Sequence, residues 1–384
     1  MTDADYMRRA IALAWRSAGH TRPNPPVGAV VVKGGKVIGE GRHRRCGGDH
    51  AETAALKACK SPPAGATVYV TLEPCSKPGR VGACCDALVA AGVKRVVWAC
   101  ADPNPANRGR AARVLRKVGI ATAHGVCADE AAELILPFAK HVTTGMPYVT
   151  VKLAQSLDGK ICDNFGSARW ISSERSRRAT GRLRERVDAI MVGAETVRKD
   201  NPSLLCHTRR NDDLWRVVVS RSGRLPRKAQ VFTDAAKDRT LVFRDAAEAV
   251  RELGRRGFMH VLCEGGLGLA RSLAAAGLVD EWITVLAPIV IGDGHLSDAF
   301  RFPGEDTIVV SASCLVPSAL CGADVNGASC FVPSALCEAK AQGIERKQRT
   351  KPPNHQTTKP PNHQTTKPPN HLTTKPCSRD LYRK

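Results

Sequence analysis

Apolar and polar residues alternate along the first third of the chain in a pattern typical of an α/β domain. Apolar side chains recur at helical spacing over residues 4–18, and Gly19 follows as the expected C-cap. The β-rich runs at 29–33 and 36–39 flank Gly34-Gly35, which predicts a hairpin. Helices and strands are then expected in turn at 50–59, 66–72, 84–91, 95–100 and 111–117. This alternation predicts three layers, with helices on both faces of a sheet.

A second α/β domain is expected to begin at about Pro147. Its predicted strands are 148–155, 189–192, 217–220 and 260–263, and a strongly basic helix is predicted at 174–186. Two of these strands run into small-residue turns at 193–197 and 264–268. Glycines between a strand and a helix leave backbone N–H groups free at the positive end of the helix dipole, which suits a phosphate. We therefore expect this domain to bind a phosphorylated cofactor.

Short repeats replace the α/β pattern near the end of the chain. The segment 313–321 recurs almost unchanged at 329–337, and Lys-Pro-Pro-Asn-His-Gln-Thr-Thr repeats from Lys351. Repeats without apolar periodicity cannot bury a core, so a disordered tail is expected, and closing strands are not recognisable after about Val310. The sequence thus predicts three parts, 1–145, 146–310 and 311–384. A frameshift or read-through into repetitive DNA is our hypothesis for the tail.

Composition limits where the protein is expected to reside. The hydrophobic fraction of 43% is ordinary for a globular protein. No run of about 18 apolar residues offers a membrane span. The start Met1-Thr2-Asp3-Ala4-Asp5 lacks the basic-then-apolar plan of a secretory signal. We therefore expect a cytoplasmic protein without a membrane partner, in which most of the 15 cysteines are reduced and some bind metal.

The formal net charge of +22 indicates an anionic partner. A dense basic patch lies at 169–186, and the tail is basic as well. A phosphorylated small substrate, a dinucleotide phosphate and a nucleic acid all suit such a charge. Binding of single-stranded nucleic acid also needs aromatic rings on which bases stack, and aromatic residues make up only 4% of the chain. We therefore expect a small phosphorylated partner and no nucleic acid.

One cluster of residue types predicts metal chemistry. His50 and Glu52 stand two residues apart at the expected start of a helix. Cys75 follows a predicted strand, and Cys84 or Cys85 opens the next helix. Catalytic zinc takes three imidazole or thiolate ligands and leaves a fourth position open for water. The cluster can supply such a set with either of the two adjacent cysteines.

The carboxylate of Glu52 is not needed as a ligand, so it is free to carry protons between water and a substrate. A zinc site that only stabilised the fold would not require this residue. A His-x-Glu followed by Pro-Cys and a further Cys, on a helix, a strand and a second helix, is typical of zinc-dependent deaminases. Asp49 is expected to cap the helix that carries the His and the Glu.

These motifs resemble a known family. His50-Ala51-Glu52 and Thr71-Leu72-Glu73-Pro74-Cys75 are similar to the deaminase half of the bifunctional deaminase/reductase family of riboflavin biosynthesis. In that family the second cysteine ligand follows an eight-residue gap and is the first of a Cys-Cys pair. The resemblance implies a cytidine-deaminase-like domain with the zinc ligands His50, Cys75 and Cys84 and the catalytic Glu52. Pro23-Asn24-Pro25 resembles a substrate loop of the family, which implies that Asn24 binds substrate.

The second half of the chain resembles the reductase half of the same family, which has a dihydrofolate-reductase-like α/β fold and uses NADPH. Ser156-Leu157-Asp158-Gly159, Asp200-Asn201-Pro202 and Glu264-Gly265-Gly266 are among the matching stretches. The residues that the resemblance places against the cofactor are Ala154, Trp170, Thr196, Asp200, Gly265, Gly266, Leu267 and Gly268. Those that it places against the substrate are Lys152, Arg184, Leu204 and Glu264.

The resemblance implies two consecutive reactions on a phosphorylated pyrimidine. The first is a zinc-dependent hydrolytic deamination, and the second is an NADPH-dependent reduction of the ribosyl group to a ribityl group. We also expect a homo-oligomer. Ala168 and His207 stand where the family usually has a Ser and an Arg, and His lacks the two-point geometry of Arg on a phosphate. The alternatives are an active deaminase joined to an impaired reductase, and a nucleic-acid editing deaminase.

Overall fold

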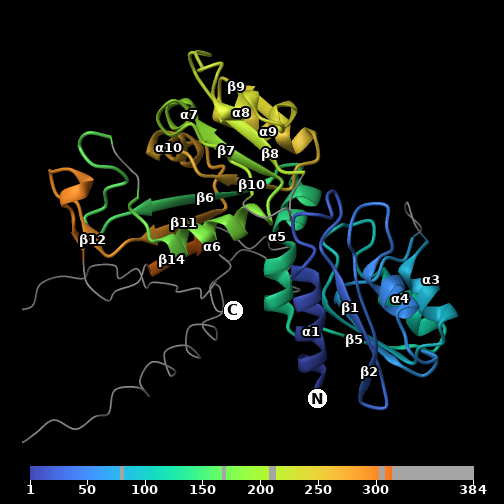
Figure 1. Ribbon diagram of the computed structural model, residues 1–384. Coiled ribbons are helices and arrows are strands. Elements are labelled where there is room, and N and C mark those ends of the chain that lie inside the picture. Colours follow the sequence, from blue (N-terminus) through green and yellow to red (C-terminus); the bar gives the residue numbers. More distant parts are fainter. Residues whose placement is uncertain (78–81, 167–169, 207–212, 302–307, 314–384) are drawn as a thin grey trace, which may run out of the picture.

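The computed structural model describes residues 1–77, 82–166, 170–206, 213–301 and 308–313. They form two α/β domains, each built on its own sheet (Figure 1). The predicted α/β class is confirmed for both domains. Ala168, His207 and the tail beyond Ser313 lie outside the described residues.

The first domain has a five-stranded sheet with the order β2-β1-β3-β4-β5. Its strands are β1 (Gly28–Lys33), β2 (Lys36–Arg42), β3 (Thr67–Leu72), β4 (Arg95–Cys100) and β5 (Ala121–His124). β1 pairs antiparallel with β2 and with β3, whereas β3, β4 and β5 are parallel to one another. The parallel strands therefore deliver the loops that follow β3 and β4 to the same edge of the sheet.

Five helices cover the two faces of this sheet. They are α1 (Asp3–Trp15), α2 (Ala51–Lys57), α3 (Cys84–Ala90), α4 (Arg110–Lys117) and α5 (Ala128–Thr144). Met7 of α1 and Ile135 of α5 join the core on one face, and Ala55, Leu88 and Leu115 of α2, α3 and α4 join the core on the other. Alternate residues of the buried strands point to the two cores, which explains their nearly continuous apolar sequences.

The second domain has a seven-stranded sheet with the order β14-β11-β6-β10-β7-β8-β9. Its strands are β6 (Tyr148–Gln155), β7 (Ala189–Gly193), β8 (Trp215–Val219), β9 (Thr240–Phe243), β10 (His260–Cys263), β11 (Glu281–Leu286) and β14 (Ile308–Ser313). All neighbours are parallel except β14, which pairs antiparallel with β11. A separate two-stranded ribbon joins β12 (Ile289–Val290) and β13 (Phe300–Arg301).

Helices cover both faces of this sheet as well. The helices are α6 (Glu174–Arg184), α7 (Ala194–Asp200), α8 (Gln230–Thr233), α9 (Ala246–Arg255) and α10 (Leu267–Ala275), and short 3-10 turns lie at Lys237–Arg239 and Leu296–Asp298. Leu253 and Leu273 of α9 and α10 pack on one face, and Leu183, Val197 and Val231 of α6, α7 and α8 pack on the other. The carboxyl ends of β7, β8, β9 and β10 thus share one edge, where ligands bind in open α/β sheets.

Several local predictions need correction. Asp49 does not cap α2; His50 is the N-cap residue, and the Asp49 carboxylate pairs with Lys57 at 2.8 Å. α1 ends at Trp15, so Gly19 is not its C-cap. Residues 193–197 do not form an extended turn, because α7 begins at Ala194. Finally, a closing strand is present, since β14 extends to Ser313, beyond the boundary expected at 310.

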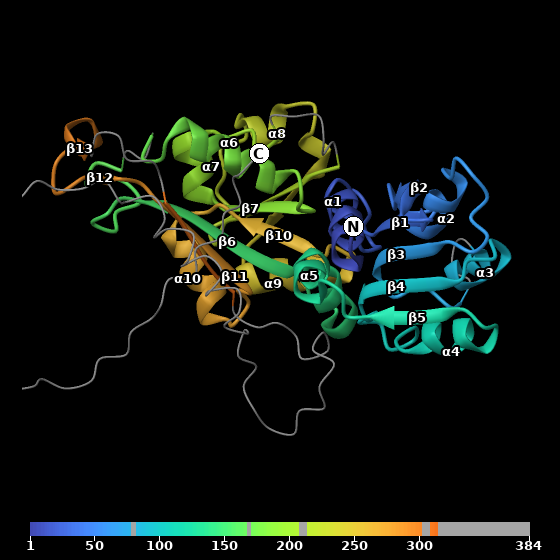
Figure 2. The same cartoon turned by 90° about the horizontal axis from the view of Figure 1, so that it is seen from below.

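The two domains meet along α1, α5 and the amino-terminal ends of the reductase strands (Figure 2). Lys140 of α5 forms an ion pair with Asp280, which also accepts a hydrogen bond from the backbone N–H of Val149 at 2.7 Å. Gly19 packs so closely here that an added Cβ would lie 2.3 Å from the carbonyl oxygen of Glu185. The glycine that was expected to end a helix therefore permits close contact between the domains.

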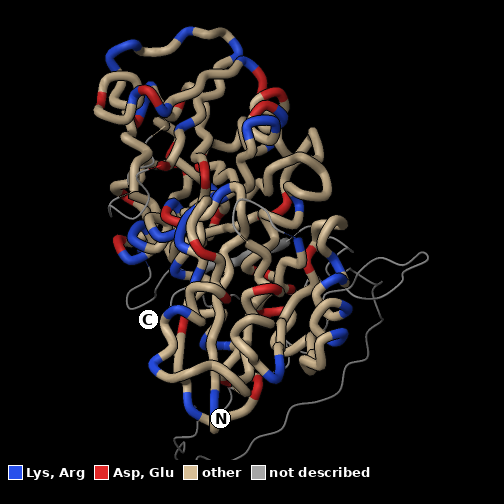
Figure 3. The backbone as a smooth tube through the Cα atoms, turned by 90° about the vertical axis from the view of Figure 1, so that its right-hand side faces the viewer, with Lys and Arg blue, Asp and Glu red and all other residues tan. Residues whose placement is uncertain are grey.

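Charged residues are distributed over both domains. Figure 3 shows Lys and Arg spread over both domains, with Asp and Glu between them. In the described part of the chain, no helix is both long and apolar enough to cross a membrane.

Candidate functional site

Three residues from three different elements converge beside the sheet of the first domain. His50 is the N-cap of α2, Cys75 follows the end of β3, and Cys84 is the first residue of α3. The Nδ1 of His50 lies 3.1 Å from the Sγ of Cys84 and 3.6 Å from the Sγ of Cys75. The three atoms all lie within 4.8 Å of one another.

This geometry fits zinc. Zinc holds nitrogen at about 2.0 Å and sulfur at about 2.3 Å in a tetrahedron, which places its ligand atoms roughly 3.5 Å apart. The separations around His50 lie near that value, and all three donors are the imidazole and thiolate types that zinc prefers. Cys85 was the alternative ligand, but its thiol is buried in the core under the sheet with Leu88. Within the described residues, the predicted set of His50, Cys75 and Cys84 is thus the one that the fold assembles.

The thiols of Cys75 and Cys84 interact with each other. A hydrogen bond from Cys84, opposed by burial and helped by His50, lowers the pKa of Cys75 to about 4. The same hydrogen bond raises the pKa of Cys84, and burial adds to that rise. The backbone N–H of Cys84 also donates to the Sγ of Cys75 at 3.2 Å. Helix α3 therefore stabilises negative charge on the neighbouring ligand, as a helix start does.

Glu52 lies in the first turn of α2, two residues after the His ligand. Its side chain is buried, with a residue exposure of 3%, yet it lines the same cavity as His50 and Cys75. Burial raises the pKa of Glu52 to about 7. A carboxyl group that can hold or release a proton near neutral pH is suited to general acid–base chemistry.

The predicted substrate residue Asn24 lies in the wall of this cavity. Its Nδ2 donates to the Nε2 of His43 at 3.0 Å, and the Nδ1 of His43 donates to the carbonyl oxygen of Asp49 at 2.9 Å. This pattern fixes the neutral tautomer of His43 with its proton on Nδ1. His43 thus connects the loop of Asn24 with the residue that precedes His50, the predicted metal ligand.

A second hydrogen-bonded group, centred on Glu73, also lines this cavity. Glu73 accepts hydrogen bonds from the backbone N–H groups of Asp102, Gly109 and Ala111, at 3.2, 3.0 and 3.1 Å. Two of these groups belong to the start of α4, where a negative charge is favourable. Glu73 therefore holds the loop after β4 against the loop that carries Cys75.

Asn107 makes the most extensive link between these two loops. Its Nδ2 donates to Asp102 at 2.9 Å and to the carbonyl oxygen of Pro74 at 3.4 Å. Its Oδ1 accepts from the backbone N–H and the hydroxyl of Ser76, at 2.9 and 3.1 Å. Asn107 therefore fixes the residues on both sides of Cys75.

The reductase domain has its own cavity, of about 550 Å³, at the carboxyl ends of β7, β8 and β9. Among the predicted cofactor residues, Thr196, Gly266 and Gly268 line it. Ala154, Trp170, Asp200, Gly265 and Leu267 do not. Gly265 has a packing role, since an added Cβ would lie 2.7 Å from the side chain of Leu269. Trp170 is 57% exposed, with the guanidinium of Arg177 at 4.4 Å from its ring centroid.

The predicted substrate residues of this domain cluster, but two of them pair with each other. Arg184 donates to both carboxylate oxygens of Glu264, at 2.7 and 2.8 Å. Burial lowers the pKa of the nearby Lys152, with Glu264 opposing this shift and Arg184 adding to it. The side chain of Leu204 is buried in the core with Val197, and its φ of 56° is unusual for a leucine.

Comparison with known proteins identifies the family of both domains. Residues 1–100 match the cytidine and deoxycytidylate deaminase zinc-binding region, and residues 147–307 match the RibD C-terminal domain. The chain is 38% identical over 315 residues to the riboflavin biosynthesis protein RibD of Aquifex aeolicus (strain VF5), covering 76% of this chain and 88% of the relative. Its identity to RibD of Escherichia coli (strain K12) is also 38%, over 327 residues, covering 76% and 89%. The chain belongs to the RibD family.

Solved structures of RibD proteins share the whole arrangement of domains. A Thermotoga maritima deaminase/reductase superposes with a TM-score of 0.74 at 33% identity, covering 81% of this chain and 99% of that one. Acinetobacter baumannii RibD gives a TM-score of 0.69 at 35% identity, covering 79% and 92%. The chain is therefore a bifunctional deaminase and reductase of riboflavin biosynthesis, with zinc and NADPH as its cofactors.

Several residues of these RibD sites escaped prediction from the sequence. The deaminase cavity, of about 420 Å³, is also lined by His43, Lys77, Asn107 and Phe138. The reductase cavity is also lined by Arg221 and Arg244, which follow β8 and β9. The sequence did contain a signal for the two arginines. Arg221 follows the end of β8 by two residues and Arg244 follows β9 directly, and the carboxyl ends of parallel strands meet at one edge of a sheet. No local signal marks Phe138, which lies inside helix α5 and reaches the cavity only through the packing of that helix.

Proposed function

We propose that this RibD first deaminates a diaminohydroxyphosphoribosylaminopyrimidine and then reduces the resulting 5-amino-6-(5-phosphoribosylamino)uracil. The Thermotoga maritima relative carries these two activities in its name. The observation that supports the first step most strongly is the cluster of His50, Cys75 and Cys84 in one cavity with the buried Glu52. A protein with only a structural zinc would have no use for that carboxyl group.

Roles can then be assigned to the main polar residues of the deaminase cavity. A bound zinc supplies the Lewis acidity that makes water a nucleophile near neutral pH. Glu52 accepts a proton from the attacking water and returns one to the departing amino group, so that ammonia leaves and a carbonyl remains. Asn24, held by His43, and Asn104 offer hydrogen bonds to the pyrimidine ring. Lys77 at the rim supplies positive charge for the phosphate of the substrate.

In the reductase cavity the protein holds cofactor and substrate together and excludes water. A bound NADPH would supply the hydride, and solvent the proton, that convert the ribosyl group to a ribityl chain. We assign Arg221 and Arg244 to the phosphate that distinguishes NADPH from NADH, because both side chains line the cavity at the ends of adjacent strands. Lys152 provides positive charge toward the substrate phosphate, and Arg184 is held beside it by its ion pair with Glu264.

One assay tests both steps separately. The purified full-length protein is given the pyrimidine phosphate, and ammonia release and NADPH oxidation are followed independently. We expect ammonia release without NADPH and oxidation of NADPH only after deamination. Glu52→Gln is expected to abolish ammonia release while leaving oxidation of NADPH with the deaminated compound intact. Ammonia release that survives this substitution would contradict the role of Glu52.

A second candidate is an active deaminase joined to an impaired reductase. The sequence favours it at Ala168 and His207, where residues that hold the substrate in the family are replaced. In that case NADPH oxidation is absent from the intact protein and is restored by His207→Arg. Normal oxidation in the unmodified protein would rule out this candidate.

We further infer that the protein is cytoplasmic and forms homo-oligomers. Both inferences rest on composition and on the family. Fractionation of cells and light scattering of the purified protein test them. A membrane-bound pool or a monomer at micromolar concentration would contradict them.

A further inference from the structure

A cavity of about 150 Å³ lies between the deaminase and reductase domains, apart from both sites described above. Its deaminase side consists of the end of α1, the loop from Thr21 to Pro26, and α5. Its reductase side consists of the amino-terminal ends of β6, β10 and β11 and the segment from Leu183 to Asp188. The reductase cavity lies at the opposite, carboxyl-terminal edge of that sheet.

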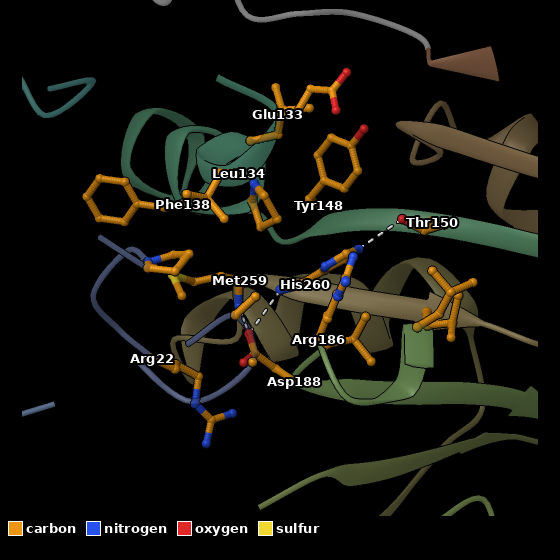
Figure 4. Close-up of a pocket in the computed structure, with 18 of the residues that line it drawn as sticks. Arg22, Glu133, Leu134, Phe138, Tyr148, Thr150, Arg186, Asp188, Met259 and His260 are labelled. Atoms are coloured by element: carbon orange, nitrogen blue, oxygen red, sulfur yellow. Dashed lines mark hydrogen bonds between the residues drawn. The ribbon is translucent and has the colours of Figure 1, made fainter. Parts of the chain in front are cut away.

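The apolar side chains in the walls of this cavity leave room for one aromatic ring. Trp15, Leu134 and Phe138 come from the deaminase domain, and Tyr148 and Ile283 come from the reductase domain. Figure 4 shows Leu134 and Phe138 extending from α5 and facing Met259, His260 and Arg186 across the cavity. An apolar cavity of about 150 Å³ is large enough to hold a benzene ring.

Arg186 introduces a positive charge into this apolar wall. Its guanidinium lies 4.7 Å from the ring centroid of Trp15. Burial lowers the pKa of Arg186, and the charged groups that act on it are Glu185 beside it in the chain and the like-charged Arg182. The buried ion pair of this segment joins Arg184 to Glu264, whereas the Arg186 guanidinium packs against an aromatic ring. Because arginine stays charged in proteins, this desolvation is a cost that an anion in the cavity would offset.

The acidic groups of the cavity are already engaged. Asp188 accepts hydrogen bonds from the backbone N–H groups of Met259 and His260, at 2.7 and 3.0 Å. Glu281 accepts the hydroxyl of Thr150 at 3.0 Å. Figure 4 shows Glu133 at the outer end of the cavity and the guanidinium of Arg22 turned away from its centre. Arg186 is therefore the charged group best placed to bind an occupant.

We propose that the interdomain cavity is a binding site for a small ring-bearing carboxylate. The carboxylate accepts hydrogen bonds from Arg186, and the ring packs against Trp15, Phe138 and Tyr148. Guanidinium and carboxylate match in a planar, two-point geometry. The occupant contacts both domains and also Phe138, which lines the deaminase cavity as well.

Isothermal titration of the full-length zinc-loaded protein with benzoate tests this site. We expect saturable binding with a dissociation constant of about 1 mM or tighter, a normal affinity for so small a ligand. Benzyl alcohol lacks the charge and acetate lacks the ring, and both are expected to bind at least about tenfold more weakly. Arg186→Met, which keeps the apolar stem, is expected to weaken benzoate binding at least about tenfold. The matched control, Arg251→Met, removes an exposed arginine on α9, outside the cavity, and is expected to change nothing.

A second variant keeps the test decisive if Arg186→Met fails to fold. Ala18 lines the cavity, and Ala18→Leu fills part of it without changing any charge, so it is also expected to weaken binding. No saturable binding up to about 20 mM benzoate would overturn the proposal. Binding that persists unchanged in a folded Arg186→Met protein would overturn it too, because the carboxylate would then be bound elsewhere, for example at the zinc. Neither result bears on the two catalytic activities.

Discussion

The guanidinium of Arg184 forms a two-point ion pair with the carboxylate of Glu264, through Nε at 2.7 Å and Nη2 at 2.8 Å. The side chains are 16% and 12% exposed, so the pair is largely shielded from water. It joins the end of α6 to the residue after β10, 80 positions later in the chain. Both residues were expected to contact substrate, and their pairing means that each one orients the other.

Removing one member of this pair is expected to cost more than removing both. Glu264→Gln leaves the charge of Arg184 shielded and uncompensated, which we expect to lower the free energy of unfolding of the reductase domain by about 3 kcal/mol. The double variant Arg184→Met/Glu264→Gln should recover part of that loss. Chemical denaturation of the unmodified protein, of the single variants Arg184→Met and Glu264→Gln, and of the double variant measures the coupling. Additive losses would show that the two residues act independently.

Asn107 is expected to affect substrate binding in the deaminase, although it is not itself one of the predicted metal ligands. Asn107→Ala removes four hydrogen bonds between the loops of Ser76 and Asp102, and we expect the KM for the pyrimidine to rise about tenfold or more. Zinc should also be lost more readily to a chelator, because Pro74 and Ser76 flank the ligand Cys75. Asn164→Ala in the reductase domain is the control. An unchanged KM together with unchanged zinc retention would contradict a positioning role.

Arg221 and Arg244 are expected to determine the choice of nicotinamide cofactor. Replacing either by Ala removes a charged hydrogen-bond donor, so we expect the KM for NADPH to rise about tenfold and that for NADH to change little. Steady-state NADPH and NADH oxidation with the deaminated substrate measures both. Arg251→Ala, an exposed arginine on α9, is the control. Equal effects on the two cofactors would place these arginines away from the distinguishing phosphate.

Removal of zinc is expected to separate the two activities. A chelator should abolish ammonia release and lower the thermal midpoint of the first domain, because metal bound to the folded state stabilises it. Oxidation of NADPH with the deaminated compound should continue, since the metal ligands lie in the other domain. Differential scanning calorimetry with and without zinc measures the shift. Loss of both activities on chelation would mean that the domains do not function separately.

His260 is expected to make the reductase domain sensitive to acid. Burial lowers the pKa of His260 to about 4, below its value in the unfolded chain, so the unfolded state binds the extra proton between about pH 6.5 and 4. Stability is therefore fully present above this window and is lost as the pH falls through it. We expect a loss of about 2 kcal/mol between pH 7 and 5. Denaturation of His260→Gln, which cannot titrate, should show a smaller loss, and equal losses would contradict the assignment.

The sequence predicted the architecture because each element leaves a local signature. β3, β6 and β10 appear as short apolar runs, and α2 and α3 begin where His50 and Cys84 stand. The errors were also local. Asp49 is a residue type that often caps helices. Its carboxylate instead forms an ion pair with Lys57, and helix propensities do not predict such a contact. The closing strand β14 begins with the β-branched run Ile308-Val309-Val310, but its continuation to Ser313 is apparent only from its pairing with β11.

Residue type and spacing by themselves determined the metal chemistry of this protein. His50, Glu52 and Cys75 stand at the ends of elements that the sequence predicts, and either Cys84 or Cys85 could complete the set. The packing of Cys85 in the core leaves Cys84 beside the other two ligand atoms. Only the tertiary structure decided the residues around them. Asn107, Phe138, the pair of Arg184 and Glu264, and the cavity at Arg186 depend on strand order and on how two domains pack. These contacts join positions distant in sequence, and no local periodicity encodes them.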